Sequence, residues 1–247
     1  MIRLSIVTAV LDSPEIVRRQ LLHYNKMNLP DNVEVVYVDD GSEPPLTQKV
    51  DTNFKFKILY TNDNRYWTQP AARNFGVKNS DGDYVLCIDV DHIVPKKTID
   101  LILTTDYDIV RFRRQVGILD KHGRFNQDMS VMRKWGLSPE RGIKLPAHSN
   151  SFSMRRGLYL ALGGVSEKHV GTGKYPNREE LELKKAIVQL GESVKILQDK
   201  TKPMIYMFPN GQYCGDKDYN PFGFFHDSTR SIRVSRRRQK SHGISQS

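Results

Sequence analysis

The sequence is poor in cysteine and has no long apolar run. Only two of its 247 residues are cysteines, and one of them, Cys87, lies inside an apolar stretch; the other is Cys214. This is too few for a disulfide framework, so we expect both thiols to be reduced and the protein to be intracellular, in the cytoplasm. No stretch approaches the roughly 20 apolar residues that cross a bilayer. The apolar part of the N-terminus is also too short for a signal sequence.

Acidic residues are absent from positions 228–247, which carry six of the ten net positive charges of the chain. This Ser- and Arg-rich segment has no apolar periodicity, and we expect it to be a flexible basic tail. Such a tail either aids solubility or binds a polyanion, which would be DNA or an anionic membrane surface. The sequence leaves these alternatives open, and it does not indicate an oligomeric state.

Short β-branched runs alternate with helical patterns in the first hundred residues. Strands are predicted at residues 4–11, 33–43, 56–61 and 84–91, and the first and the last of them are expected to be buried. A first helix is predicted to begin at Pro14 with Ser13 as its N-cap, and a second from Pro70 to the turn at 81–82. Near-continuous apolar strands that alternate with helices favour an α/β fold, in which a mostly parallel sheet is covered by helices on both faces.

The second half of the chain is less regular. A strand is predicted within residues 108–117. Residues 149–167 predict a short strand followed by a helix that stops at the glycine pair 163–164. Residues 177–192 give the clearest helical pattern, with acids in the first turn and Gly191 as its C-terminal stop.

Two acidic motifs follow predicted strands. The sequence VDDGS, at residues 38–42, ends the second strand, and DVDH, at residues 89–92, ends the fourth. In open parallel sheets, ligands bind outside the carboxyl ends of the strands. We therefore expect both motifs to lie at one edge of the sheet and to form the functional site.

Asp89 and Asp91 form a D-x-D pair after a buried strand. Two neighbouring carboxylates repel each other unless a cation lies between them, and their hard oxygens suit Mg²⁺ or Mn²⁺ together with substrate phosphates. The spacing alone occurs often by chance, and the alternative is that Asp89 caps a turn while Asp91 is solvated. The position after an apolar strand favours the metal.

Six segments together resemble a known family. They are residues 5–12, 33–42, 71–77, 82–95, 151–167 and 178–191. In this order they are similar to family 2 nucleotide-sugar glycosyltransferases with the GT-A fold, over about residues 2–192. The resemblance implies a single Rossmann-like GT-A domain at 1–227, with a nucleotide-binding half at 1–105 and an acceptor-binding half at 106–227, followed by the tail.

The resemblance implies a donor site for a UDP- or GDP-sugar. Ala9 and Asp40 match positions that hold the nucleotide base, Arg73 matches an arginine near the nucleotide, and Asp89 matches the residue near the sugar and ribose. For Asp40, a role in the turn before Gly41 is compatible with base binding. The Arg73 guanidinium can pair with phosphate or with an acid of the site; the alternative is an exposed helix cation.

The resemblance also implies a metal shell for Mn²⁺ or Mg²⁺. Asp91 matches the metal ligand, with Asp89 beside it. In relatives of this fold a C-terminal histidine can complete the shell, which points to His226, although its place beside two phenylalanines is equally explained by packing. We rank His226 ahead of His92, whose place beside Asp91 can be incidental. Arg230 would contact the diphosphate.

The catalytic base implied by the resemblance is Glu180, with Glu179 as its neighbour. In an inverting transfer, a base deprotonates the acceptor hydroxyl while the nucleoside diphosphate leaves from the opposite face. The family more often has a Gly-rich segment and an aspartate here, which leaves the choice between the two glutamates open. The alternative is that both acids only complement the N-terminus of a helix.

The expected activity is therefore that of a hexosyl- or pentosyltransferase, and the acceptor is open. Basic motifs at 111–114 and 155–157, with the tail, would suit DNA that carries a hydroxylated base, but a glycan, a lipid carrier or a protein fits as well. A nucleotidyltransferase would need a Gly-rich phosphate loop, and residues 9–20 contain no glycine. A nucleic-acid-binding protein that acts through its tail is the non-enzymatic alternative.

Overall fold

The computed structural model describes residues 1–65, 67–128, 130, 144–145, 151–172, 180–197 and 204–207. The helices are α1 (Pro14–Met27), α2 (Gln69–Lys78), α3 (Lys96–Thr104), α5 (Arg156–Ala161) and α6 (Leu181–Leu190), with a short 3-10 turn at Gly191–Ser193. The strands of the first half are β1 (Leu4–Val10), β2 (Val33–Asp39), β3 (Lys55–Tyr60), β4 (Tyr84–Ile88), β5 (His92–Ile93), β6 (Ile109–Arg111) and β7 (Arg113–Val116). They are followed by β8 (Ile118–Leu119), β9 (Phe125–Asn126), β10 (Lys144–Leu145), β11 (Phe152–Arg155), β12 (Ile196–Leu197) and β13 (Met204–Met207).

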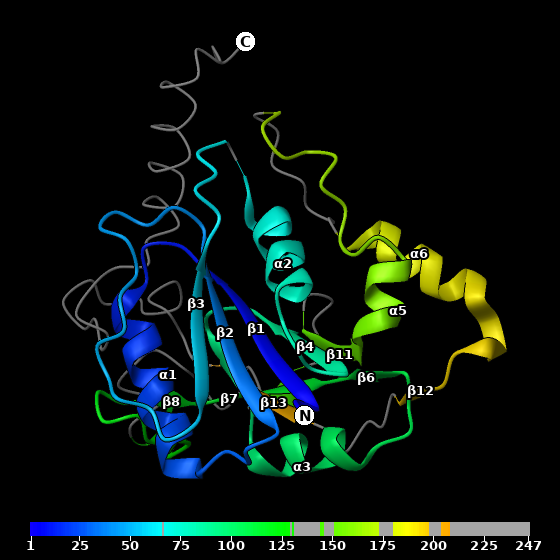
Figure 1. The fold of residues 1–247 in the computed structure, drawn as a ribbon. Helices are drawn as coiled ribbons and strands as arrows, with labels where there is room; N and C mark the ends of the chain where they lie inside the picture. The colour runs from blue at the N-terminus through cyan, green and yellow to red at the C-terminus, as the bar shows by residue number, and fades with distance from the viewer. Residues whose placement is uncertain are drawn as a thin grey trace.

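A seven-stranded central sheet organises the fold (Figure 1), in the order β12-β6-β11-β4-β1-β2-β3. β1 pairs in parallel with both β2 and β4, and β2 pairs in parallel with β3. β11 is antiparallel to both of its neighbours, β4 and β6. The expected α/β fold with a mostly parallel sheet is therefore confirmed.

Helices cover both faces of this sheet, as expected. Alternate side chains of a strand point to opposite faces, so Leu4 and Ile6 of β1 join one apolar core with α1 and α3, whereas Val7 joins the other with α2, α5 and α6. Burial on both faces explains why the central strand β4 (YVLCI) is apolar throughout rather than alternating. Among the described helices, none combines the length and the apolar character needed to cross a bilayer.

The strand predicted within residues 108–117 is divided between two sheets. β6 pairs with β11 and β12 in the central sheet, whereas β7 pairs with β10 and β13 in a second, four-stranded sheet that also holds β5. The two strands are separated by Phe112, whose side chain is fully buried in the core with α1 and α3. The hydrophobic pattern alone did not reveal this break, because Phe112 is buried in the core although it belongs to neither strand, and a buried apolar residue is also what a continuous strand would have there.

The predicted end of the second strand and the predicted cap of α1 need correction. β2 ends at Asp39 rather than at 43, because the Asp39 carboxylate accepts hydrogen bonds from the backbone of Ser42 (2.8 Å) and Leu46 (2.7 Å) and so closes a turn. Ser13 stands at the N-cap position of α1, but its hydroxyl donates to the carbonyl of Leu11 and makes no capping hydrogen bond. The predicted stop at 163–164 is confirmed, since both glycines adopt positive φ directly after α5.

Gly76 sets the close approach of α2 to the sheet, and its replacement tests this packing. A Cβ at this position would lie 2.6 Å from side-chain atoms of both Val7 and Val38. We expect Gly76→Ala to lower the free energy of unfolding by about 1–3 kcal/mol through overpacking, although alanine favours the helix. Urea denaturation measures the change.

Gly157 of α5 provides the matched control, because a Cβ there would meet nothing within 4 Å. Gly157→Ala should be neutral or slightly stabilising. Equal stability of the two variants would contradict the close packing of α2.

Candidate active site at the carboxyl edge of the sheet

The carboxyl ends of β1, β2 and β4 meet at one edge of the sheet, as the sequence predicts. In the strand register, Val10 lies beside Asp39, and Thr8 lies beside Ile88. The backbone N–H of Asp40 donates to the carbonyl of Val10 (2.8 Å), which fixes the first residue after β2 against the end of β1. Ala9, the residue before the last of β1, is half-buried. The two residues expected to hold a nucleotide base thus lie near the ends of neighbouring strands, Ala9 within β1 and Asp40 directly after β2.

Asp40 is buried and held by the N-terminus of α2. The hydroxyl of Thr68, the residue before α2, donates to Oδ2 of Asp40 (2.8 Å). The turn after β2 is closed by the carboxylate of Asp39 instead, so Asp40 is not needed for that purpose. Sequence reasoning did not identify Thr68; its position two residues before the predicted helix start at Pro70 was the available signal.

Arg73 pairs with Asp89 at the same edge. Its Nη2 lies 3.0 Å from Oδ1 of Asp89, and its side chain is only 1% exposed. Of the alternatives considered for Arg73, the exposed helix cation is therefore wrong; its guanidinium pairs with Asp89, and a contact with the nucleotide phosphates stays a prediction. A guanidinium that is buried this deeply needs a charged partner, and Asp89 supplies it.

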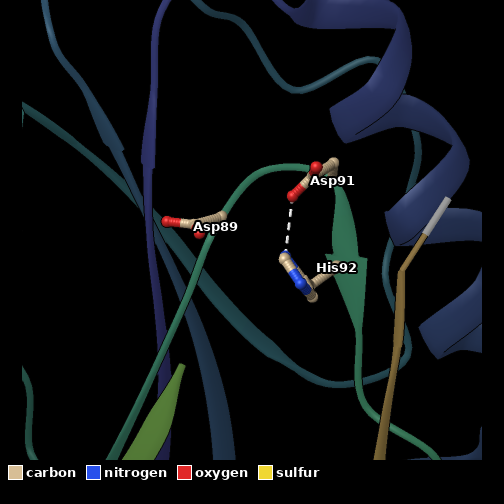
Figure 2. Close-up of side chains that lie close together, drawn as sticks. All are labelled: Asp89, Asp91 and His92. Carbon is tan, nitrogen blue, oxygen red and sulfur yellow. Dashed lines mark ion pairs between the residues drawn. The ribbon is translucent and has the colours of Figure 1, made fainter. Parts of the chain in front are cut away.

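Asp89, Asp91 and His92 form an acidic cluster after β4. Each offers a ligand atom, and these atoms all lie within 4.8 Å of one another. Figure 2 shows Asp91 turned toward His92, whose Nδ1 lies 2.7 Å from Oδ1 of Asp91. Burial disfavours a charged His92, but the carboxylates of Asp91 and Asp89 outweigh burial and raise the pKa of this imidazole. The structure thus brings His92 into the cluster, which the ranking from sequence did not anticipate.

The cluster fits a hard divalent cation. The side chains of Asp89 and Asp91 are 19% and 21% exposed, so their oxygens are accessible from solvent. Carboxylate oxygens are the ligands that Mg²⁺ and Mn²⁺ prefer. Both carboxylates also carry a partner, Arg73 for Asp89 and His92 for Asp91, so these contacts do not rank one above the other as a ligand. His92 is buried behind Asp91 and can orient its carboxylate, as groups behind metal ligands commonly do.

Gln20 of α1 holds the backbone that carries the cluster. Its Nε2 donates to the carbonyls of Val90 (2.7 Å) and His92 (2.9 Å), and its Oε1 accepts from the hydroxyl of Tyr37 (2.7 Å). Gln20 is fully buried, so this amide is satisfied entirely by the protein. Sequence reasoning missed it, because a lone glutamine in an amphipathic helix gives no distinctive signal.

Glu180 occupies the N-terminal boundary of α6 and is 8% exposed. Its Oε1 lies 3.4 Å from Nζ of Lys184, and its side chain makes no capping hydrogen bond. The side chain of Glu180 therefore does not cap the N-terminus of α6 by a hydrogen bond. The other expected residues, Glu179, His226 and Arg230, lie outside the described part of the chain, as does the basic tail.

Residues 155–157, one of the two basic motifs, are engaged in the fold itself. Nε of Arg155 pairs with Asp108 (2.7 Å), and its guanidinium stacks over the ring of Tyr84. Arg156 donates to the carbonyls of Val77 (3.0 Å) and Lys78 (2.9 Å) at the end of α2. The contacts of these two side chains are thus structural, and the prediction of a polyanion site depends on residues 111–114 and on the tail.

A double-mutant cycle tests the pair between Arg73 and Asp89. Arg73→Met leaves a partly buried carboxylate without its partner, whereas Arg73→Met combined with Asp89→Asn removes both charges. We expect a coupling free energy of about 1–3 kcal/mol from urea denaturation, because breaking one side of a buried pair costs more than removing both. Additive single effects would show that the pair is not formed in solution.

Comparisons with known proteins agree with this fold. S. aureus TarS, residues 1–349, shares the fold with a TM-score of 0.51 at 18% identity, covering 84% of this chain and 60% of that one. The same S. aureus protein in complex with UDP-GlcNAc gives 0.51 at 17% identity, covering 97% and 66%, and its complex with UDP gives 0.50 at 16%, covering 98% and 72%.

No curated protein matches the sequence significantly. The chain spans 60% of the length of the TarS structure named first. A model of the family described as Glycosyl transferase family 2 matches residues 5–159, more than half of the chain. The mostly parallel sheet of GT-A type and the acidic carboxyl edge agree with this match. The chain therefore belongs to glycosyl transferase family 2.

Proposed function

We propose that the protein transfers a sugar from a UDP-sugar to an acceptor hydroxyl, with a divalent cation and with inversion at the anomeric carbon. The observation that carries this proposal is the acidic cluster of Asp89, Asp91 and His92 at the carboxyl edge of a family 2 fold. UDP and UDP-GlcNAc are bound in the TarS complexes of similar fold, which favours a uridine donor here.

The donor nucleotide binds beside Asp40 and Ala9. A carboxylate accepts hydrogen bonds from a base edge or a ribose hydroxyl, and the Thr68 hydroxyl holds Asp40 in place for this purpose. Because Asp40 is buried and anchored before the donor arrives, little conformational freedom is lost when the donor binds.

Asp91 and Asp89 would hold the cation, and a divalent ion there would supply positive charge for the leaving diphosphate. Arg73 fixes Asp89 from α2, and His92 fixes Asp91 from β5. Both contacts keep the carboxylates in place in spite of their mutual repulsion. His226 as a further ligand and Arg230 as a diphosphate contact stay predictions.

Glu180 is the proposed base, with Glu179 as the alternative. Its carboxylate accepts the proton of the acceptor hydroxyl as the new carbon–oxygen bond forms and the bond to the diphosphate breaks on the opposite face. A low exposure of 8% and the Lys184 ammonium at 3.4 Å support a carboxylate held in one orientation.

The acceptor and the sugar type stay predictions. DNA with a hydroxylated base, a glycan, a lipid carrier or a protein each supplies a hydroxyl group. Residues 111–114 and the tail, which are basic, favour an acidic acceptor.

Asp91→Asn tests the cation site. The substitution keeps the size of the side chain and removes its charge, so we expect Mn²⁺-dependent thermal stabilisation by UDP-GlcNAc to disappear. Asp100→Asn, at an exposed acid of α3, is the matched control and should keep the full stabilisation. Unchanged Mn²⁺ dependence in Asp91→Asn would overturn the assignment.

Glu180→Gln tests the base. We expect donor affinity within about twofold of the unsubstituted protein and a turnover lowered by about 10²–10⁴, the usual contribution of a general base. Donor affinity is measured calorimetrically with UDP-GlcNAc, and turnover by the release of UDP. Glu182→Gln, at an exposed acid in the first turn of the same helix, should keep normal turnover. Normal turnover in Glu180→Gln would place the base elsewhere.

A further inference from the structure

α1 lies beside β8 (Figure 1), and a cavity is formed by residues of α1 and of the hairpin of β8 and β9. Its volume is ≈ 520 Å³, and the side chains that line it include His23, Lys26, Met27, Arg124 and Phe125. Gln20, one turn before His23 on α1, holds the backbone of the acidic cluster, but the cavity has its own lining: none of its lining residues is Asp89, Asp91 or His92.

His23 presents a hydrogen-bond acceptor that no described residue uses. Its Nδ1 lies 3.0 Å from the carbonyl oxygen of Gly123, so Nδ1 carries the proton and donates it. Burial, together with the nearby ammonium of Lys26, lowers the pKa of His23, and the ring is neutral near pH 7. Nε2 then has a free lone pair, and within the described chain this buried atom has no partner. A ligand group that donates a hydrogen bond would satisfy it.

The walls of the cavity are positively charged. Lys26 is anchored at the rim by a hydrogen bond from Nζ to the carbonyl of His122 (2.7 Å), and Nε of Arg124 pairs with Asp120 (2.7 Å). This contact engages only Nε of Arg124, and the side chain is 68% exposed, so its terminal amino groups are accessible. Among the described residues that line the cavity, none is acidic. The two cations would therefore attract an anionic group to the cavity that also holds the Nε2 acceptor of His23.

The hairpin is pressed against α1, which preforms the cavity. Gly123 has a φ of 73°, and a Cβ there would lie 2.6 Å from the backbone nitrogen of His23 and 2.7 Å from Cβ of Leu22. Asp120 closes the turn by accepting from the backbone of His122 and Arg124. The lining side chains thus come from two elements that are fixed to each other.

We propose that this cavity is a second binding site, for a sugar phosphate. The phosphate lies between Lys26 and Arg124, a sugar hydroxyl donates to Nε2 of His23, and the carbon skeleton packs against Phe125 and Met27. The site is distinct from the donor site, and the proposal does not depend on the proposed transfer activity.

Titration of the full chain with glucose 6-phosphate, followed by calorimetry and by the ¹⁵N signal of the His23 ring, tests the proposal. Glucose 6-phosphate should bind and move the Nε2 signal, whereas inorganic phosphate or glucose alone should bind about tenfold more weakly, because each makes only part of the contacts. Asp91→Asn should leave this binding unchanged, since the acidic cluster takes no part in it.

Three substitutions divide the site into its parts. Arg124→Gln and Lys26→Gln should each weaken glucose 6-phosphate by about tenfold, because a charge-assisted contact is lost. His23→Asn places an amide N–H where Nδ1 stood and removes the Nε2 acceptor; it should weaken glucose 6-phosphate by about tenfold and leave inorganic phosphate unaffected. Lys121→Gln is the control, because this exposed lysine belongs to the same hairpin but does not line the cavity.

The outcomes are decisive in either direction. Loss of affinity in the three variants, but not in Lys121→Gln, supports the site. Absence of binding to the full chain, equal affinity for inorganic phosphate and glucose 6-phosphate, or equal losses in the control and the cavity variants would overturn it.

Discussion

The buried ion pair between Arg73 and Asp89 is the interaction on which the candidate active site depends. α2 reaches the carboxyl edge of the sheet through this pair and through the hydrogen bond of Thr68 to Asp40. Close packing at Gly76 sets the distance between the helix and the strands, so that both contacts form at once. One helix therefore fixes acids that follow two different strands, β2 and β4.

The same helix also fixes the segment after α5. The side chain of Asn74 donates to the carbonyl of Val165 (2.9 Å) and accepts from the Tyr159 hydroxyl (2.6 Å). Arg73 and Asn74 are adjacent in the chain but have different partners. Arg73 pairs with Asp89, directly after β4, whereas Asn74 contacts α5 and the segment that follows it. A change in the position of α2 would consequently displace the acids of the edge and the later part of the fold together.

The sequence predicted what depends on local pattern. Apolar runs located the main strands, and Asp residues after them located the carboxyl edge, because strand ends in a parallel sheet meet by topology alone. It did not predict Thr68, Gln20 or the role of His92, since these side chains find their partners across the fold and carry no periodic signal. The break at Phe112 was missed for a related reason: hydrophobicity reports burial but not which of two sheets a strand joins.

The acidic edge is held from both faces of the sheet, and this explains how two carboxylates can stay close together. α2 supplies a positive charge to Asp89 from one face. From the other face, α1 supplies no charge but fixes the backbone of residues 90 and 92 through Gln20, which keeps Asp91 beside His92. Each carboxylate thus has its own partner, Arg73 for Asp89 and His92 for Asp91, and these contacts oppose the repulsion between the two acids. The side chains of both aspartates nevertheless stay 19% and 21% exposed, so the edge that these contacts hold in place is still open to solvent.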